Sequence, residues 1–229
     1  MMGLKGLIVG CGRSGTGFVA NYLTDNGLPS GHEDLFDVYG CRVSNSELEY
    51  ESSWYAVPYL QILDPSVRIL HVVRHPEKVA ASFFRIGLFD KRPWQHITKG
   101  NAVKFASGAL LSPGAAVERI EFVRAHRRFL RRHLDLPLIS DEIMKLQSYW
   151  AQWNSIIEQQ VEAKGFPYLR VKIEDFNSRR SEIDAHFSLD GSRSSSLPRN
   201  EKIGYVRKST PTFSPTLETF NLMTRYGYD

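Results

Sequence analysis

The sequence of 229 residues predicts an α/β fold, a three-layer α/β/α arrangement around a central, mainly parallel sheet. In two places, beginning at Leu7 and at Val67, an apolar run is followed by a sharp turn and then by helical spacing. A third apolar strand, residues 166–173, follows a long amphipathic helix over residues 141–164. Strands that alternate with helices are typical of parallel sheets covered by helices. Since no repeat or change of composition divides the chain, we expect one domain, residues 1–229.

The first of these segments places a glycine-rich turn between a strand and a helix. Residues 7–9 are apolar, and Gly10, Gly12 and Gly15 then follow within six positions. The next residues have helical spacing and predict a helix over residues 14–25. Glycine lets the backbone turn sharply and approach a ligand, and the start of a helix carries a partial positive charge. The turn is therefore a predicted binding site for a phosphate or a sulfate.

Two common anion-binding templates fit this turn poorly. The dinucleotide fingerprint needs an acidic residue such as Glu33 at the end of a second strand, but residues 26–32 consist of turn formers. The nucleotide-triphosphate loop needs a lysine after its last glycine, and here Gly15 is followed by Thr16 and Gly17. An ATPase would therefore lack its main phosphate ligand and the hydroxyl that usually binds its metal.

The second strand–turn–helix segment carries another possible anion ligand set. Residues 67–73 form an apolar run, Arg74 follows at its end, and Pro76 stands where a helix would begin. Ser82 lies two turns into that helix, so Arg74 and Ser82 can converge on one anion as a forked donor and a hydroxyl donor. Taken alone, a capping arginine and a packed serine would be the simpler interpretation. Beside the glycine loop, the sequence predicts a second anion site.

The two segments together resemble the cofactor motifs of the sulfotransferases that use 3′-phosphoadenosine 5′-phosphosulfate (PAPS). Residues 12–16, Gly-Arg-Ser-Gly-Thr, are similar to their 5′-phosphosulfate loop, and residues 74–82 to their 3′-phosphate motif. The resemblance, which is to the bacterial type, implies a P-loop-like sulfotransferase fold with PAPS as donor. It implies cofactor binding by Gly12, Arg13, Ser14, Gly15, Thr16, Gly17, Phe18, Arg74 and Ser82.

The candidate catalytic residues are Arg13, His32 and Glu33. Cytosolic animal members of the family usually carry lysine where Arg13 stands. Because arginine keeps its proton, Arg13 is expected to stabilise charge on the leaving oxygen without donating a proton. His32 and Glu33 lie in a predicted loop, residues 29–34, after the first helix, and either can supply a general base. A solvated loop pair is the simpler interpretation, but Gly-His-Glu after the first helix is similar to many bacterial sulfotransferase-like proteins.

Several other stretches allow two interpretations. Ser-Ser-Trp at residues 52–54, which begins a passage from a strand end into a helix, can line the cleft, or Trp54 can belong to the core. Residues 84–114 are an irregular stretch that suits either an acceptor-binding insertion or a solvated loop. A helix over residues 115–134 has a basic side, interpreted as solvated, formed by Arg124, Arg127, Arg128, Arg131 and Arg132.

The C-terminal third contributes support for the cofactor site and one basic loop. The helix over residues 141–164 and the strand ending before Glu174 and Asp175 also resemble the family, where the acidic pair is thought to support the fold. In that family a late basic loop closes over the 3′-phosphate. The corresponding stretch here is residues 199–208, with candidates whose register no motif fixes: Asn200, Lys202 and Arg207. A last helix is expected over residues 216–226.

Composition limits the function classes. The net charge of +4 suits an anionic ligand but is too small to indicate nucleic acid. The two cysteines, Cys11 and Cys41, lack metal-ligand spacing, and Cys11 sits inside the glycine loop, which favours a reducing compartment. The sequence shows no run of about 20 apolar residues for a membrane span and no room for a signal peptide before the first strand. We therefore expect a cytoplasmic protein that needs no metal.

These observations predict a sulfotransferase that moves the sulfuryl group of PAPS to a hydroxyl or amine of a small-molecule or glycan acceptor. The alternative is a P-loop nucleotide-binding protein or kinase, which would need Mg²⁺ and ATP. A third possibility is a binding protein that keeps the cofactor loop but transfers nothing. The acceptor, the choice between His32 and Glu33, and the oligomeric state stay open at this point.

Overall fold

The computed structural model describes residues 3–42, 48–86, 89, 124–137, 141–189 and 212–228. At its centre lies a five-stranded sheet in the order β2-β5-β1-β6-β7, and every pair of neighbours in it is parallel. Its strands are β1 (Gly6–Gly10), β2 (Ser30–His32), β5 (Tyr50–Ser52), β6 (Arg68–Val73) and β7 (Tyr168–Lys172). A separate antiparallel pair consists of β3 (Phe36–Asp37) and β4 (Gly40–Cys41). The prediction of a mainly parallel sheet is confirmed.

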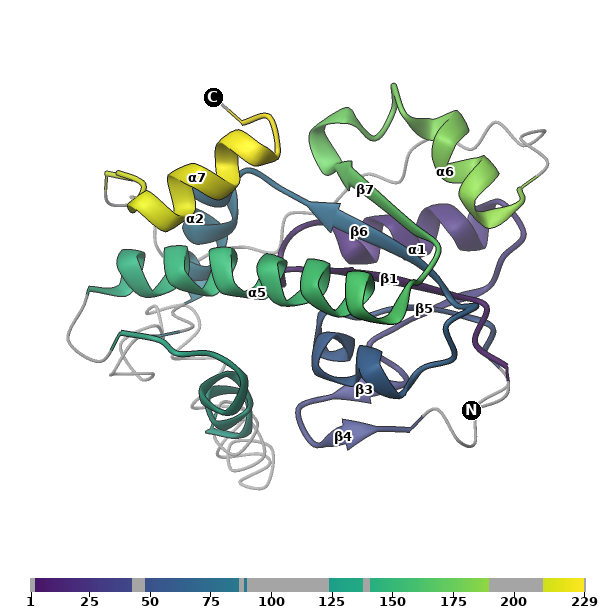
Figure 1. Cartoon of the computed structure of the whole chain (residues 1–229), viewed down its shortest axis with the longest axis horizontal. Helices are drawn as coiled ribbons and strands as arrows, with labels where there is room; N and C mark the ends of the chain where they lie inside the picture. Colours follow the sequence, from purple (N-terminus) through teal and green to yellow (C-terminus); the bar gives the residue numbers. More distant parts are fainter. Residues whose placement is uncertain are drawn as a thin grey trace, which may run out of the picture.

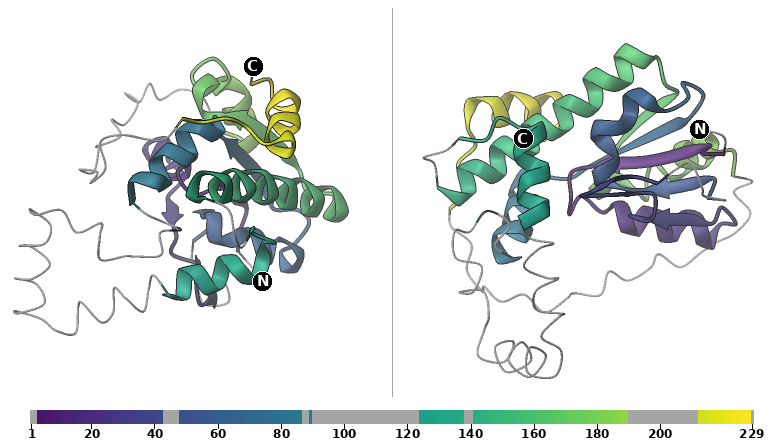
Figure 2. Two further views of the ribbon diagram at one scale, coloured as in Figure 1. Left: turned by 90° about the vertical axis from the view of Figure 1, so that its left-hand side faces the viewer. Right: turned by 90° about the horizontal axis from the view of Figure 1, so that it is seen from below.

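Helices cover both faces of this sheet, and α1 and α5 lie on opposite sides of it (Figures 1 and 2). The helical elements are α1 (Thr16–Asp25), η2 (Trp54–Ile62), α2 (Pro76–Ile86), α5 (Glu142–Lys164), η4 (Ile173–Asp175), α6 (Arg180–Phe187) and α7 (Leu217–Arg225). Residues 124–133 are also helical. Successive strand residues point to opposite faces, so Leu7 and Val9 join the cluster under α5 while Ile8 joins the cluster under α1. The fold is therefore an α/β arrangement of three layers.

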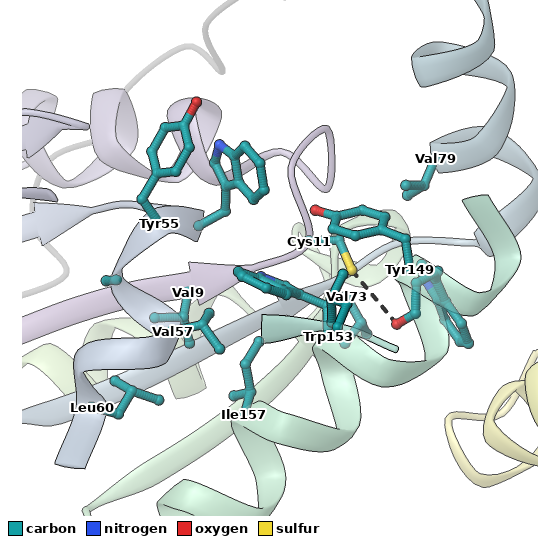
Figure 3. Packing of buried hydrophobic residues seen from close by; sticks show 14 of the residues in the cluster. Val9, Cys11, Tyr55, Val57, Leu60, Val73, Val79, Tyr149, Trp153 and Ile157 are labelled. Atoms are coloured by element: carbon teal, nitrogen blue, oxygen red, sulfur yellow. Dashed lines mark hydrogen bonds between the residues drawn. The ribbon is translucent and has the colours of Figure 1, made fainter. Parts of the chain in front are cut away.

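The larger of the two clusters is aromatic and lies between β1, η2 and α5. Figure 3 shows Val9 and Val57 facing Trp153, with Tyr149 beside Cys11 of the glycine loop. Trp150 and Trp153 have no exposed surface, as the apolar stripe of the predicted helix indicates. The Asp141 side chain caps the start of α5, and Gly165 ends it at a φ of 69°, a left-handed conformation that glycine adopts without strain.

Two short elements differ from the prediction. Residues 30–32 were expected in a loop, but they form β2 at the edge of the sheet, where Gly31 pairs with Glu51. A Cβ on Gly31 would lie 2.2 Å from Glu51 Oε2, so glycine here permits strand pairing over a buried side chain. The predicted helix after Ser52 is a 3₁₀ run, Trp54–Ile62, with Pro58 inside it.

The existence of β2 does not restore the dinucleotide template. In that fold the second strand lies beside the first, whereas here the neighbours of β1 are β5 and β6. The predicted helix at the C-terminus is confirmed as α7. Of the predicted helix over residues 115–134, the part that the structure describes is helical over residues 124–133.

Candidate functional site

The glycine loop connects the end of β1 to the start of α1. Arg13 and Gly15 both adopt left-handed backbone conformations, with φ values of 70° and 103°. A Cβ on Gly12 would lie 2.7 Å from the Phe83 ring, so this glycine allows the loop to pack closely against α2. The amide of Gly12, a residue for which the resemblance implies cofactor binding, donates to the Tyr149 hydroxyl at 2.7 Å. Tyr149 thus holds the loop from the side of α5 (Figure 3).

Ser14 and Thr16 lie at the base of the loop. Ser14 is fully buried, its amide donates to the Cys11 carbonyl at 3.0 Å, and among the described residues its hydroxyl has no hydrogen-bond partner. Thr16 begins α1, whose first-turn amides have no acceptor within the helix. The first turn of α1 contains no acidic residue. A buried, unpartnered hydroxyl beside these amides fits an anion that supplies the missing acceptor.

The two predicted anion motifs meet at the carboxyl ends of β1 and β6. Gly10 pairs with Val72 in the sheet, so the residues after each strand are neighbours. Arg13 Nε donates to Ser82 Oγ at 2.9 Å, and Arg74 Nη1 donates to the Arg13 carbonyl at 3.0 Å. The structure therefore brings Arg13, Arg74 and Ser82 together, although Ser82 lies 69 residues from Arg13.

The predicted acid–base pair lies on the other side of the loop, at the end of β2. His32 Nδ1 lies 3.1 Å from the Ser52 carbonyl, and a Cβ on Gly17 would lie 2.9 Å from His32 Nε2. With Nδ1 donating to that carbonyl, Nε2 is the acceptor and faces the start of α1. His32 is thus oriented by the backbone of β5, with one nitrogen toward the predicted cofactor loop.

Glu33 follows at a φ of 63°, and its amide donates to the same Ser52 carbonyl at 3.0 Å. Burial raises the pKa of the Glu33 carboxyl, against the charges of His32 and Arg13 and a hydrogen bond with Trp54. A carboxylate with a raised pKa is a better proton acceptor than an exposed one. Both base candidates therefore lie beside the loop, one toward α1 and the other near Arg13 and Trp54.

Trp54, which the sequence left between core and cleft, lies beside the loop and packs among other aromatic side chains. A Cβ on Gly12 would lie 3.3 Å from the Trp54 ring, and Trp54 packs on Tyr55 with ring centroids 4.2 Å apart. The Tyr55 hydroxyl lies 3.1 Å from His126 Nδ1, and burial lowers the pKa of His126 to about 4. Trp54 is 5% exposed, so it belongs to the core and to the edge of the site at once.

The sequence did not identify Tyr149 and Glu51 as contributors to the site. Tyr149 lies on the predicted long helix, but the spacing of that helix does not show that the Tyr149 hydroxyl accepts from the Gly12 amide. Glu51 lies in a stretch of mixed composition that the sequence left unassigned, and its carboxyl is fully buried beneath the turn that carries His32 and Glu33.

Glu174 ties the start of α2 to the C-terminal segment. Its carboxylate accepts from the His75 amide at 3.3 Å, Lys78 Nζ at 3.2 Å and the Tyr228 hydroxyl at 3.0 Å. Burial opposes ionisation of Glu174, but these hydrogen bonds outweigh it and lower the pKa. Glu174 therefore supports the segment just after Arg74.

Some of the predicted features lie outside the described residues. These are most of the 84–114 stretch and the whole late basic loop with Asn200, Lys202 and Arg207. In the part of the chain that is described, no three His, Cys, Asp or Glu side chains are grouped so that they could hold a metal ion. No helix within those residues has the length and apolar character needed to cross a membrane.

Comparison of the chain with models of protein families finds no matching family, and comparison with curated proteins finds no matching relative. The assignment of a function therefore depends on the geometry of the site. That geometry combines two arginines, a glycine loop at the start of a helix and an oriented His–Glu pair, which together suit binding of an anionic donor and removal of a proton.

Proposed function

We propose that this chain is a PAPS-dependent sulfotransferase with a P-loop-like sulfotransferase fold. The observation that carries the proposal is the link between the two motifs, in which Arg13 contacts Ser82 and is itself contacted by Arg74. A donor with a 5′-phosphosulfate and a separate 3′-phosphate needs cationic groups at two points on one sheet edge. A nucleotide without a 3′-phosphate would leave the arginine and serine after β6 without a ligand.

The residues of the loop fit the 5′ end of such a donor. The amides at the start of α1 and the buried hydroxyl of Ser14 would bind phosphosulfate oxygens, and Thr16 and Gly17 line the same turn. Arg74 and Ser82 would hold the 3′-phosphate, with the guanidinium as a forked donor. Two free thiols, Cys11 and Cys41, accord with the reducing cytoplasmic compartment that we expect.

When bound, PAPS supplies an activated sulfuryl group. Transfer forms a bond from the acceptor oxygen or nitrogen to sulfur, breaks the bond from sulfur to the 5′-phosphate oxygen, and releases adenosine 3′,5′-bisphosphate. Arg13 stabilises the negative charge that grows on the leaving oxygen. His32 or Glu33 takes the proton of the acceptor, since both lie beside the loop. The loop and strand ends hold the reacting groups in line.

Sulfate transfer from ³⁵S-labelled PAPS tests this proposal. The wild-type protein is assayed with a panel of alcohols, phenols, amines and sugars, beside Arg13→Ala and an exposed control, Arg42→Ala. We expect transfer to at least one acceptor class, strongly reduced in Arg13→Ala and unchanged in the control. Binding of PAPS without transfer to any acceptor would overturn the enzyme assignment. Magnesium-dependent binding of ATP in preference to PAPS would favour a P-loop kinase.

A further inference from the structure

A carboxyl group is buried in the middle of the sheet, beneath the turn that carries the predicted base. Glu51 is the central residue of β5 and has no exposed surface. In the sheet Gly31 pairs with Glu51 and His32 pairs with Ser52, so the side chain of Glu51 lies next to the point where β2 ends. Carboxylates are rarely buried completely unless they have partners, so its contacts indicate its role.

The contacts of Glu51 are with the backbone of that turn. Its Oε1 accepts from the Asp34 amide at 3.1 Å, and its Oε2 is buried without a hydrogen-bond partner among the described residues. A second carboxyl group, that of Asp34, lies in the same turn, and its Oδ2 accepts from the His32 amide at 3.0 Å. A Cβ on Gly31 would lie 2.2 Å from Glu51 Oε2 and 2.9 Å from Asp34 Oδ2. The two carboxyl groups therefore enclose the backbone of residues 31–34.

The pKa of Glu51 is consistent with a carboxyl that is buried beside a second carboxyl group. Burial raises its pKa to about 7, and the neighbouring charge of Asp34 acts in the same direction, while the hydrogen bond from the Asp34 amide opposes the shift. The Asp34 amide belongs to a turn in which Glu33 has a φ of 63°. The amide that follows this left-handed residue has its acceptor within the protein, at Glu51 Oε1.

A buried carboxyl is a costly way to fill space in a sheet. An apolar side chain of similar size would avoid the desolvation penalty that a buried carboxyl carries. What an apolar side chain cannot do is accept hydrogen bonds from the turn. Without that acceptor, the Asp34 amide would lose its partner, and the left-handed conformation of Glu33 would lose a support.

We propose that Glu51 is a positioning residue that fixes the His32–Glu33 turn against the glycine loop. It acts through the backbone of the turn and does not contact the donor loop itself. The inference rests on the proposed function for what the turn does, namely acceptance of a proton during sulfuryl transfer. The structural part, that Glu51 orders the turn, stands on the contacts alone.

The experiment compares Glu51→Gln and Glu51→Ala with the matched pair Glu49→Gln and Glu49→Ala. Glu49 lies two residues earlier and is half-exposed, with an ion pair to Lys5 on the surface. Glutamine keeps an acceptor oxygen for the Asp34 amide, whereas alanine removes it. Three quantities are measured for each variant: hydrogen exchange at residues 33–35, affinity for adenosine 3′,5′-bisphosphate, and kcat and KM for sulfate transfer.

We expect Glu51→Ala to accelerate exchange of the Asp34 amide and to lower kcat, each by about tenfold or more, because one buried hydrogen bond is lost. Affinity for adenosine 3′,5′-bisphosphate should stay within about twofold of wild type, since the donor loop is not touched. Glu51→Gln should restore the slow exchange and most of kcat, and both Glu49 variants should match wild type. This split between kcat and donor affinity, with rescue by glutamine, distinguishes positioning from a general loss of fold.

Wild-type exchange at Asp34 in a folded Glu51→Ala variant would overturn the proposal, and so would equal losses of kcat and donor affinity. If Glu51→Ala does not fold, Glu51→Asp replaces it, because the shorter side chain withdraws the acceptor while keeping the charge. Absence of transfer in the wild-type protein would defeat the proposed function, whereas the exchange data would still decide whether Glu51 orders the turn.

Discussion

Arg74 donates a hydrogen bond from Nη1 to the backbone carbonyl of Arg13 at 3.0 Å, across the carboxyl ends of two neighbouring strands. The two residues are 61 positions apart, and each was predicted from a separate sequence motif. Arg13 in turn has a left-handed backbone, which its carbonyl contact helps to stabilise. One arginine therefore orders the loop that carries the other, and substitutions at either position test both motifs.

Removal of the Arg13 guanidinium should affect transfer more than binding. In Arg13→Ala we expect sulfate transfer to fall by about 100-fold or more, because charge on the leaving oxygen loses its stabilising cation. Arg13→Lys keeps the charge but loses the Nε donor to Ser82, so its loss should be smaller. Single-turnover rates at saturating PAPS measure the effect. Transfer by Arg13→Ala within twofold of wild type would contradict the assigned role.

The choice between the two base candidates is decided by parallel glutamine variants. His32→Gln and Glu33→Gln keep hydrogen-bonding capacity but cannot accept a proton in the same way. One of them should lower transfer by about 100-fold, the effect expected for loss of a general base, and the other by less than about tenfold. If both variants keep more than a tenth of the wild-type rate, neither residue is the base.

The pH dependence of transfer gives a separate test for Glu33. Burial raises the pKa of its carboxyl above the ordinary value of a glutamate. If Glu33 is the base, the enzyme is active only at pH values above this raised pKa, where the carboxyl is ionised. The transfer rate should fall as the pH is lowered through the raised pKa of Glu33. This decrease at low pH should be absent in Glu33→Gln. A rate that stays constant down to the ordinary carboxyl range would exclude Glu33.

The hydroxyl of Tyr149 is expected to stabilise the glycine loop. In Tyr149→Phe the buried Gly12 amide loses its acceptor, which should lower the free energy of unfolding by about 1–3 kcal/mol. Urea denaturation measures the change. The control is Tyr39→Phe, because Tyr39 is 70% exposed and its substitution should change stability by less than about 0.5 kcal/mol. Equal stabilities of the two variants would show that the hydroxyl does not hold the loop.

Glu51 should make stability depend on pH near neutrality. Its pKa in the folded protein, about 7, lies above the value of an unfolded glutamate, so the folded state binds more protons between these values. The contribution to stability is complete at acidic pH and is lost as the pH rises through 7. Between pH 5 and pH 8, wild type should lose about 2 kcal/mol more of its unfolding free energy than Glu51→Gln. Parallel pH profiles of the two proteins would contradict this.

The sequence was most informative where spacing fixes backbone geometry. The strand before Gly10 and the strand before Arg74 were predicted with their helices, because apolar runs, glycine and proline mark these boundaries. Tryptophans 150 and 153 were predicted in the core and are fully buried. The sequence assigned Arg13 and Ser82 to two separate anion sites, and the hydrogen bond between their side chains was found only in the structure.

The sequence was least informative where a polar residue is buried by a tertiary contact. The strand Ser30–His32 has no apolar pattern, because it is an edge strand three residues long whose central residue is glycine. Glu51 looks like a surface residue in the sequence, since its burial depends on the close approach of Gly31 from another strand. Local composition carries no record of such pairings, so both were assigned only by the structure.

The central claim, two separate sites for the two ends of one adenosine donor, is tested most directly by equilibrium binding of adenosine 3′,5′-bisphosphate and 5′-AMP. Titration calorimetry compares wild type, Arg74→Ala and the control Arg68→Ala, in which the arginine removed lies at the other end of β6 and contacts Ser188. Wild type and the control should prefer the bisphosphate by about 10- to 100-fold, as charge-assisted hydrogen bonds predict, and Arg74→Ala should lose this preference. Equal affinity of the wild-type protein for both nucleotides, or a preference that survives in Arg74→Ala, would contradict the account.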